Sequence, residues 1–133
     1  MRLYRVLFVC IGNACRSQMA EGFAHAHGRG VLLAKSAGMN PCDMLSPVTA
    51  QLMREKGIVL DGCPKGLDDT GMNFDLILNM SGMPLAGPPS VQVRQWPVED
   101  PISFTEERHR AVRDQIEGLV LGLIEELRRR RTR

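Results

Sequence analysis

The sequence predicts an α/β fold of one domain, residues 1–133, built on a four-stranded, parallel, open sheet with helices on both faces. Short apolar runs alternate with segments of helical periodicity along the whole chain. The first run, residues 6–9, is apolar at every position, which is typical of a strand buried on both faces of a parallel sheet. The chain contains no internal repeat, low-complexity segment or linker, and its 133 residues suit one compact core.

The first strand is followed by a helix, a second strand and a loop. Over residues 17–27 the apolar side chains recur at helical spacing, with Ser17 as the expected N-cap and glycines after the end. Residues 31–34 predict the second strand. Residues 36–41, Ser-Ala-Gly-Met-Asn-Pro, have the composition of a loop.

The middle of the chain is expected to hold a second helix and a long irregular stretch. Ser46 is a natural N-cap, Pro47 fits the first helical position, and Gly57 ends this helix. Residues 61–71 are rich in Gly and Asp, which predicts a loop with a short helix around residues 67–69.

Two further strands and a long helix complete the predicted fold. The strands are expected at residues 76–78 and 91–96, separated by an irregular segment, 79–89, with three prolines and two glycines. From residue 105 the chain predicts one helix whose apolar stripe indicates core packing rather than a ligand site. That stripe comprises Val112, Ile116, Leu119, Val120, Leu123, Ile124 and Leu127.

The composition argues against several classes of function. The formal net charge is +2, and the one dense basic run, 128–131, lies at the end of the last helix, so we expect neither nucleic acid nor a membrane as a partner. The apolar runs are far shorter than the ~20 residues that span a bilayer, and the N-terminal residues lack signal-peptide character, so we expect a cytoplasmic protein. The four cysteines form no Cys-x-x-Cys pair and the three histidines no zinc-ligand spacing; we therefore expect no metal and no organic cofactor.

The segment between the first strand and the first helix predicts a loop that binds an oxyanion. Its residues are Cys10, Ile11, Gly12, Asn13, Ala14, Cys15, Arg16 and Ser17. Successive backbone N–H groups that curl at a helix N-terminus form a nest for an anion, and the helix dipole adds partial positive charge. Gly12 and Asn13 accept the left-handed backbone that such a curl requires, and Arg16 offers a planar fork to two oxygens of a phosphate.

Cys10 stands at the end of a strand, facing that positive nest, which favours its thiolate. The hydroxyl of Ser17 can add a hydrogen bond to the sulfur. A thiolate beside a bound phosphate can displace the leaving alcohol in line, while Arg16 and the amides stabilise the transition state. The loop therefore predicts a covalent cysteinyl-phosphate intermediate.

The run from Cys10 to Ser17, continued by Gln-Met-Ala-Glu-Gly at 18–22, resembles the signature of the low-molecular-weight protein tyrosine phosphatase superfamily. That superfamily includes phosphatases and arsenate reductases on one fold. Residues 36–38, Ser-Ala-Gly, and 99–101, Glu-Asp-Pro, also resemble the family at comparable positions. The resemblance thus covers nearly the whole chain.

The resemblance implies a role for each of five residues. Cys10 would be the nucleophile, Arg16 the oxyanion clamp and Asp100 the general acid. Asn13 would brace the loop. Cys15 would be a redox neighbour able to form a reversible disulfide with Cys10.

The position of Asp100 also fits an acid on physical grounds. It follows the fourth predicted strand and the pair Trp96-Pro97, which places it at a strand's carboxyl end, and Pro101 stiffens the backbone after it. A carboxyl group there can protonate the leaving group and later activate water. The alternative is a structural Asx turn or a cap before the last helix.

Two further cysteines and two histidines are expected to have no role in the chemistry. Cys42 and Cys63 lie in loop sequence and are predicted to be incidental small residues, with a regulatory pair or resolving thiols as the alternative. His25 and His27 are expected to be solvated side chains on the first helix.

Three functions fit the loop. Gln18 resembles the arsenate reductases, but residues 79–89 contain no cysteine for an internal thiol relay of the thioredoxin-coupled kind. We therefore predict a phosphomonoester phosphatase, by resemblance a protein tyrosine phosphatase, acting on a phosphorylated protein or a small phosphomonoester. The alternative is an arsenate reductase that uses arsenate and an external small thiol. A non-catalytic oxyanion-binding module is the third.

Overall fold

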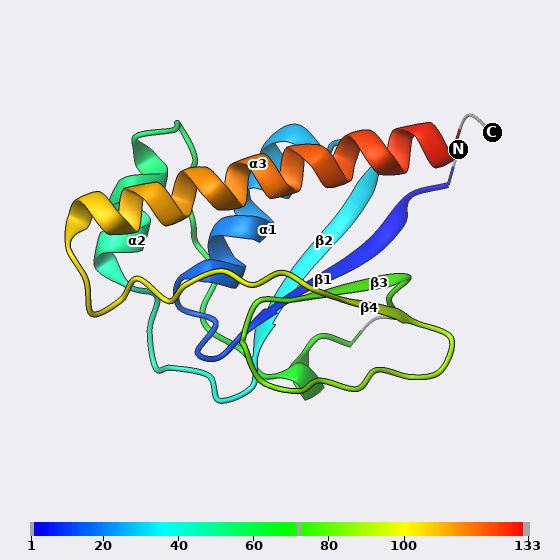
Figure 1. Cartoon of the computed structure of the whole chain (residues 1–133), viewed down its shortest axis with the longest axis horizontal. Helices are drawn as coiled ribbons and strands as arrows, with labels where there is room; N and C mark the ends of the chain where they lie inside the picture. The colour runs from blue at the N-terminus through cyan, green and yellow to red at the C-terminus, as the bar shows by residue number, and fades with distance from the viewer. Residues whose placement is uncertain (1, 72, 132–133) are drawn as a thin grey trace.

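The computed structural model describes residues 2–71 and 73–131 and contains, within them, four parallel strands and three α-helices. The strands are β1 (Tyr4–Cys10), β2 (Leu32–Gly38), β3 (Leu76–Asn79) and β4 (Gln92–Gln95). The helices are α1 (Arg16–His27), α2 (Pro47–Arg54) and α3 (Glu106–Arg131), with a short 3₁₀ helix, η1 (Leu67–Asp69). The sheet order is β2-β1-β3-β4 with every pair parallel, so the predicted α/β fold is confirmed (Figure 1).

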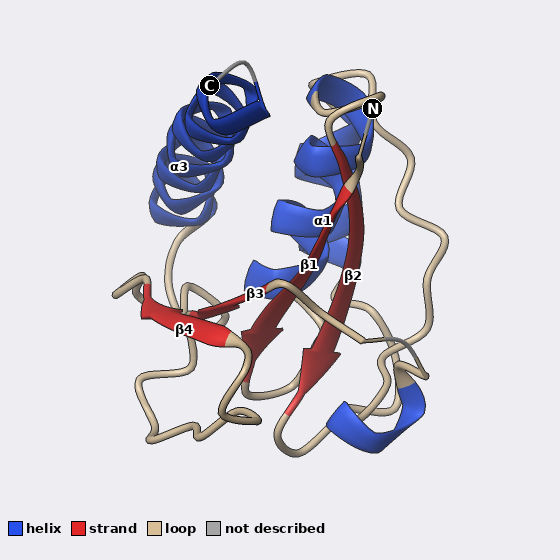
Figure 2. Ribbon diagram, turned by 90° about the vertical axis from the view of Figure 1, so that its right-hand side faces the viewer, coloured by secondary structure: helices blue, strands red, loops and turns tan. Residues whose placement is uncertain are grey.

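The two faces of β1 are buried in different layers. Val6 and Phe8 pack in the layer that contains α1 and α3, whereas Leu7 and Val9 pack in the layer under η1 and the loops. All four side chains are buried, which explains why this run is apolar at every position. In Figure 2, α3 and η1 lie on opposite sides of β1 and β2.

The apolar stripe of α3 packs into the larger layer, as predicted. Ile116 and Val120 are fully buried, and a buried aliphatic side chain stabilises the fold by about 1.5–3 kcal/mol relative to an exposed one. Arg94 of β4 donates to the carboxylate of Glu126 at 2.8 Å, which ties this helix to the edge of the sheet. In residues 2–71 and 73–131, no helix combines the length and the apolar character needed to cross a membrane.

β2 is longer than the sequence predicts. Residues 36–38, expected in a loop, continue the strand because they pair in register with residues 8–10 of β1. That pairing satisfies their backbone groups, and the hydroxyl of Ser36 also donates to the carboxylate of Glu21 on α1 at 2.5 Å. The sheet pairing therefore overrides a composition typical of loops.

The starts of two helices differ in their capping. Ser46 caps α2 as predicted, with its Oγ accepting from the backbone N–H of Thr49 at 3.4 Å. The prediction that Ser17 caps α1 is wrong, because this helix begins at Arg16 and no side chain of the described residues caps it. Ser17 lies in the first turn, buried. The N–H groups at the start of α1 are therefore left to a ligand or to water.

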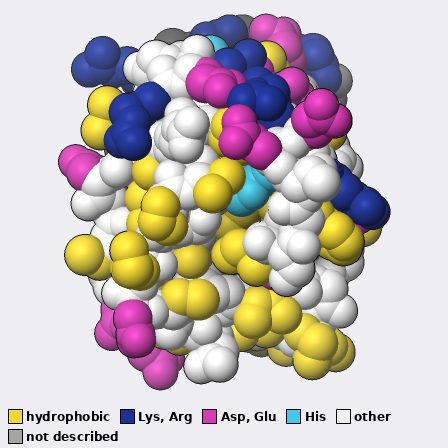
Figure 3. Space-filling model, turned by 90° about the vertical axis from the view of Figure 1, so that its left-hand side faces the viewer, with side chains coloured by type: hydrophobic (Ala, Val, Ile, Leu, Met, Phe, Trp, Pro, Cys, Tyr) yellow, Lys and Arg dark blue, Asp and Glu magenta, His cyan; other side chains and the backbone are white. Residues whose placement is uncertain are grey.

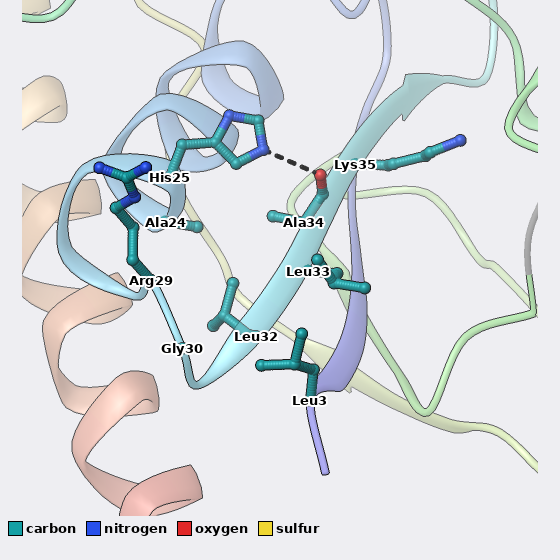
Figure 4. A pocket seen from close by; sticks show the side chains of 9 residues that line it. All are labelled: Leu3, Ala24, His25, Arg29, Gly30, Leu32, Leu33, Ala34 and Lys35. Atoms are coloured by element: carbon teal, nitrogen blue, oxygen red, sulfur yellow. Dashed lines mark hydrogen bonds between the residues drawn. The ribbon is translucent and has the colours of Figure 1, made fainter. Parts of the chain in front are cut away.

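β2 forms one edge of the sheet, and the end of α1 lies along it. His25 is exposed, as predicted, and its Nε2 also donates to the carbonyl oxygen of Ala34 at 3.0 Å (Figure 4). A groove of about 480 Å³ beside this contact is lined mainly by apolar side chains, including Leu3, Leu32 and Leu33. The groove lies at the amino ends of β1 and β2, whereas open parallel sheets bind ligands at their carboxyl ends.

Ile116→Ala is expected to lower the free energy of unfolding by about 2–5 kcal/mol, because it leaves a cavity where a fully buried side chain stood. Urea denaturation followed by circular dichroism measures the change. Leu121→Ala is the matched control, since Leu121 lies on the same helix and is 43% exposed. It is expected to cost less than about 0.5 kcal/mol. Equal losses in the two variants would contradict the burial assigned to this helix.

Candidate active site

The loop between β1 and α1 lies at the carboxyl end of the sheet and borders a cavity of about 220 Å³. Cys10, Arg16 and Asp100 all line this cavity, although they are far apart in the sequence. The exposed side chains of Ile11 and Ile102 add apolar surface to the lining. Figure 3 shows the end of the molecule where α2 and the start of α3 lie, with hydrophobic side chains over much of the face and charged ones at its top, sides and lower left. The three predicted chemical groups are thus brought together.

The carbonyl groups of the loop are engaged on its outer side. The segment 39–46, which follows β2, donates four backbone hydrogen bonds to them, with N···O distances of 2.8–3.1 Å. These run from Met39 to Cys10, from Asn40 to Ile11, from Cys42 to Gly12 and from Ser46 to Ala14. The C=O and N–H of a trans peptide point in opposite directions, so the following amides turn to the inner side. The loop therefore presents N–H groups to the cavity, as an anion nest requires.

Gly38 allows this close approach of the two segments. A Cβ atom added there would lie 2.6 Å from the carbonyl oxygen of Ile11 and 2.8 Å from the backbone nitrogen of Asn13. Both neighbours are backbone atoms, so neither can move aside without distorting the loop. Gly38 is thus required by packing rather than by its backbone angles.

Asn13 joins the loop to a distant segment. It has a φ of 52°, in the left-handed region that the sequence predicts for this curl, and it is fully buried. Its Nδ2 donates to the hydroxyl of Ser17 at 2.7 Å, and its Oδ1 accepts from the backbone N–H of Lys65 at 2.9 Å. These two bonds compensate for the uncommon backbone conformation.

Ser17 lies beside the sulfur of Cys10. Its Oγ lies 2.9 Å from the sulfur of Cys10. Oγ also accepts a hydrogen bond from Nδ2 of Asn13, and its own hydrogen is free to be donated to Cys10. The predicted contact of Ser17 with the sulfur of Cys10 is therefore present, whereas the predicted helix cap is not.

Arg16 is held from behind by carbonyl groups near the ends of two strands. Its side chain is only 6% exposed, and Nη1 donates to the carbonyl oxygens of Met80, at 2.5 Å, and Val98, at 2.9 Å. Nη2 lies 3.7 Å from Oδ2 of Asp100. With Nη1 anchored, the edge formed by Nε and Nη2 remains available to an oxyanion in the cavity.

Both interpretations of Asp100 are supported at once. Its Oδ1 accepts from the backbone N–H of Ile102 at 3.2 Å, which is the Asx-turn contact. Its Oδ2 faces Arg16, and the side chain is half-exposed and lines the cavity. The turn therefore positions a carboxyl group at the cavity beside the loop.

Cys15 has a buried polar environment of its own. Its sulfur lies 3.3 Å from Nε2 of His109, and the same nitrogen lies 2.9 Å from the hydroxyl oxygen of Thr49. Burial raises the pKa of the Cys15 thiol to about 12. Burial also lowers the pKa of His109, against smaller opposing effects of Asp100 and Glu106. The thiol of Cys15 is therefore held protonated beside a neutral imidazole.

The predicted anion-binding residues divide into two groups. Five of them line the cavity with Cys10, whereas Asn13 and Ser17 lie behind the loop and support it. The five are Ile11, Gly12, Ala14, Cys15 and Arg16. Among the described residues, no group of His, Cys, Asp and Glu side chains is arranged to hold a metal ion.

Sequence analysis considered Cys42 only as an alternative resolving thiol, and it missed two further residues near the site. Cys42 lines the cavity, and His109 and Thr49 contact Cys15. The signal for Cys42 was the topology, because segments that follow neighbouring parallel strands meet at one edge of a sheet. The signal for His109 was its place in the first turn of the helix that follows Asp100. No local sequence pattern indicated that Thr49 lies near the site.

Known proteins resemble the chain over most of its length. Residues 5–87 match the family described as low molecular weight phosphotyrosine protein phosphatase. A glutaredoxin arsenate reductase of Synechocystis sp. is 32% identical over 126 residues, which cover 90% of this chain and 95% of that protein. An arsenate reductase of Bacillus licheniformis is 36% identical over 124 residues, which cover 84% of this chain and 88% of that protein.

Solved structures share the fold. An arsenate reductase in the phosphate binding state aligns with a TM-score of 0.84 at 31% identity, covering 94% of this chain and 99% of that one. The YwlE arginine phosphatase from Geobacillus stearothermophilus aligns with a TM-score of 0.79 at 25% identity, covering 97% of this chain and 96% of that one.

These comparisons correct the predicted activity. The sequence favoured a phosphomonoester phosphatase, but relatives that are 29–36% identical are named arsenate reductases. The phosphatase prediction is therefore wrong as the leading interpretation, and its alternative is better supported. The physical reason for the error is that arsenate and phosphate are tetrahedral oxyanions of the same charge, which one loop can bind alike.

Gly38→Ala is expected to destabilise the fold by about 1–3 kcal/mol and to weaken binding of inorganic phosphate at least tenfold, because the new methyl group meets the backbone of the loop. Chemical denaturation and isothermal titration calorimetry measure the two effects. Gly118→Ala is the control, since a Cβ there meets open space within α3 and is expected to stabilise the helix by up to about 1 kcal/mol. Wild-type phosphate binding by Gly38→Ala would refute the packing argument.

Cys15 is expected to react with iodoacetamide at pH 8 at least about 100-fold more slowly than Cys42, because the thiolate is the reactive form. Its pKa of about 12 leaves about one thiolate in 10,000 at that pH, and this fraction rises tenfold per pH unit below 12. Peptide mapping by mass spectrometry follows each cysteine separately, with exposed Cys63 as the internal reference. Similar rates at all three positions would contradict the environment described for Cys15.

Proposed function

Because the chain belongs to the low molecular weight phosphotyrosine protein phosphatase family and is a cysteine-dependent enzyme, we propose that it is an arsenate reductase that draws electrons from an external small thiol. The observation that carries the proposal is that relatives near one-third identity, aligned over most of the chain, bear that name. The whole chain, residues 1–133, acts as one domain with one catalytic site.

Arsenate binding uses the loop amides and the guanidinium of Arg16. The inward-facing N–H groups of residues 11–17 and the Nε–Nη2 edge of Arg16 bind the oxygen atoms of the dianion. The supporting observations are the outward engagement of the loop carbonyls and the anchoring of Nη1 by Met80 and Val98. Donors that the fold already orients need little reorganisation when the anion binds, so they stabilise its charge effectively.

The first chemical step forms a bond between sulfur and arsenic. The thiolate of Cys10, stabilised by the hydroxyl of Ser17, attacks arsenic, and one arsenic–oxygen bond breaks. The departing oxygen leaves as water with a proton from Asp100, whose carboxyl group lines the same cavity. Arg16 stabilises the charge on the oxygen atoms that remain.

The second step reduces arsenic. A thiol sulfur attacks Sγ of Cys10, a disulfide bond forms, and the sulfur–arsenic bond breaks with its electron pair on arsenic. Arsenic(V) thereby becomes arsenic(III), and two thiols are oxidised to one disulfide. In sum, arsenate and two thiols give arsenite, one disulfide and water. The absence of cysteine from residues 79–89 supports a reductant outside the chain, as does the glutaredoxin in the name of the Synechocystis relative. A reduced thiol pool favours the cytoplasm as the place of action.

The proposal predicts that the purified protein forms arsenite from arsenate when glutathione is present, measured by arsenic speciation. Cys10→Ser is expected to abolish the reaction, because serine cannot form the disulfide that releases arsenite. Arg16→Lys is expected to lower kcat/KM about 10²–10³-fold through loss of the planar fork.

Arg54→Lys, at an exposed position of α2, is the matched control and is expected to leave kcat/KM unchanged. The proposal fails if well-folded wild-type protein forms no arsenite with glutathione, cysteine or dithiothreitol. It fails equally if Cys10→Ser turns over at the wild-type rate.

A further inference from the structure

We infer that Cys42 is the thiol that attacks Cys10 and releases arsenite, so that the external thiol reduces a Cys10–Cys42 disulfide. This inference rests on the proposed arsenate reduction and names the residue responsible for its second step. The observation behind it is that three cysteines, Cys10, Cys15 and Cys42, line one cavity. Their environments differ enough to separate their roles.

Cys42 lies directly against the loop that carries the nucleophile. Its backbone N–H donates to the carbonyl oxygen of Gly12 at 2.9 Å. Its sulfur occupies the space that a side chain at position 12 would need, since a Cβ there would lie 2.5 Å from it. Gly12 therefore leaves a place for this sulfur at the lining of the cavity.

The Cys42 segment is able to approach Cys10. Cys42 is exposed, and residues 39–46 contain no regular helix or strand. Gly12, which Cys42 touches, is two residues from Cys10, at most about 7 Å along the chain. A disulfide needs Cα atoms about 4.4–6.8 Å apart, so bond formation requires a shift of a few ångströms by this segment. Cys42 itself would give up its backbone hydrogen bond to Gly12, while the backbone bonds of Met39, Asn40 and Ser46 hold the rest of the segment on the loop.

Cys15 is poorly suited to the same task. Its side chain is buried, its sulfur contacts His109, and its pKa of about 12 leaves little thiolate near neutrality. It also precedes Arg16, whose guanidinium is fixed by Met80 and Val98. Movement of Cys15 toward Cys10 would disturb the residue that binds the anion.

The electrons and atoms balance with Cys42 in this role. The Cys42 thiolate attacks Sγ of Cys10 in the arsenic adduct, the sulfur–sulfur bond forms, and arsenite departs with the pair from the sulfur–arsenic bond. Asp100 supplies the proton that completes the water released in the first step, and the proton lost by the Cys42 thiol is taken up by an oxygen of the departing arsenite. Two molecules of external thiol then reduce the disulfide, which is accessible because Cys42 is exposed.

A single turnover without external thiol tests the inference. The protein is reduced, freed of reductant, given one equivalent of arsenate and quenched with iodoacetamide. Wild type is expected to release close to one arsenite per chain and to yield the linked peptides of Cys10 and Cys42. Cys42→Ser is expected to release less than a tenth of that amount until glutathione is added. Cys63→Ser, at an exposed cysteine outside the cavity lining, is expected to match wild type.

The outcomes separate this inference from the proposed function. Wild-type release by Cys42→Ser, or a Cys10–Cys15 linkage in its place, would overturn the role of Cys42 and leave arsenate reduction standing. Release of arsenite from wild type only when glutathione is present would also overturn the role of Cys42 and leave arsenate reduction standing. If glutathione-supplied wild type forms no arsenite, the proposed function fails and this inference with it. Oxidation by diamide without arsenate gives an independent readout, and failure to link Cys10 to Cys42 would overturn the pairing itself.

Discussion

The anion site depends on one constraint, which is that four carbonyl groups of the loop after β1 are engaged outside it. Peptide geometry then decides where the following N–H groups point. The engagement requires β1 and β2 to be parallel neighbours, because only then do the segments after both strands run side by side. Gly38 lies where that approach is tightest. The positions of Arg16 and Cys42 at the cavity both depend on a loop that is held in this way.

The segments that follow β2 and β3, the two strands that flank β1, each hold a different part of the site. The segment after β2 holds the loop backbone, while the segment after β3 holds the guanidinium of Arg16 through Met80. The site therefore lies where the chain passes to either side of β1, which is where open parallel sheets form a crevice. Asp100, which follows β4, completes the cavity from the same edge.

Local patterns predicted the strands, the helices and the loop from Cys10 to Arg16, because buried strands, helix periodicity and nest-forming residues leave signals in a few adjacent positions. Local sequence patterns failed where contact with a residue far along the chain determines the structure. Residues 36–38 are a strand because β1 pairs with them, and α1 begins at Arg16 without the cap expected from Ser17. The contact of His109 with Cys15 needs the packing of α3. The activity was misassigned because the two candidate substrates share shape and charge.

The protein would be more stable with an anion bound in the loop than without one. The first turn of α1 has no cap from the side chains of the described residues, so a bound anion supplies acceptors that water otherwise provides. A ligand that binds only the folded state, at 100 times its dissociation constant, adds about 2.7 kcal/mol to the free energy of unfolding. The anion would then act as a folding partner as well as a ligand. The steady-state amount of folded protein would rise with the concentration of the ion that binds the loop.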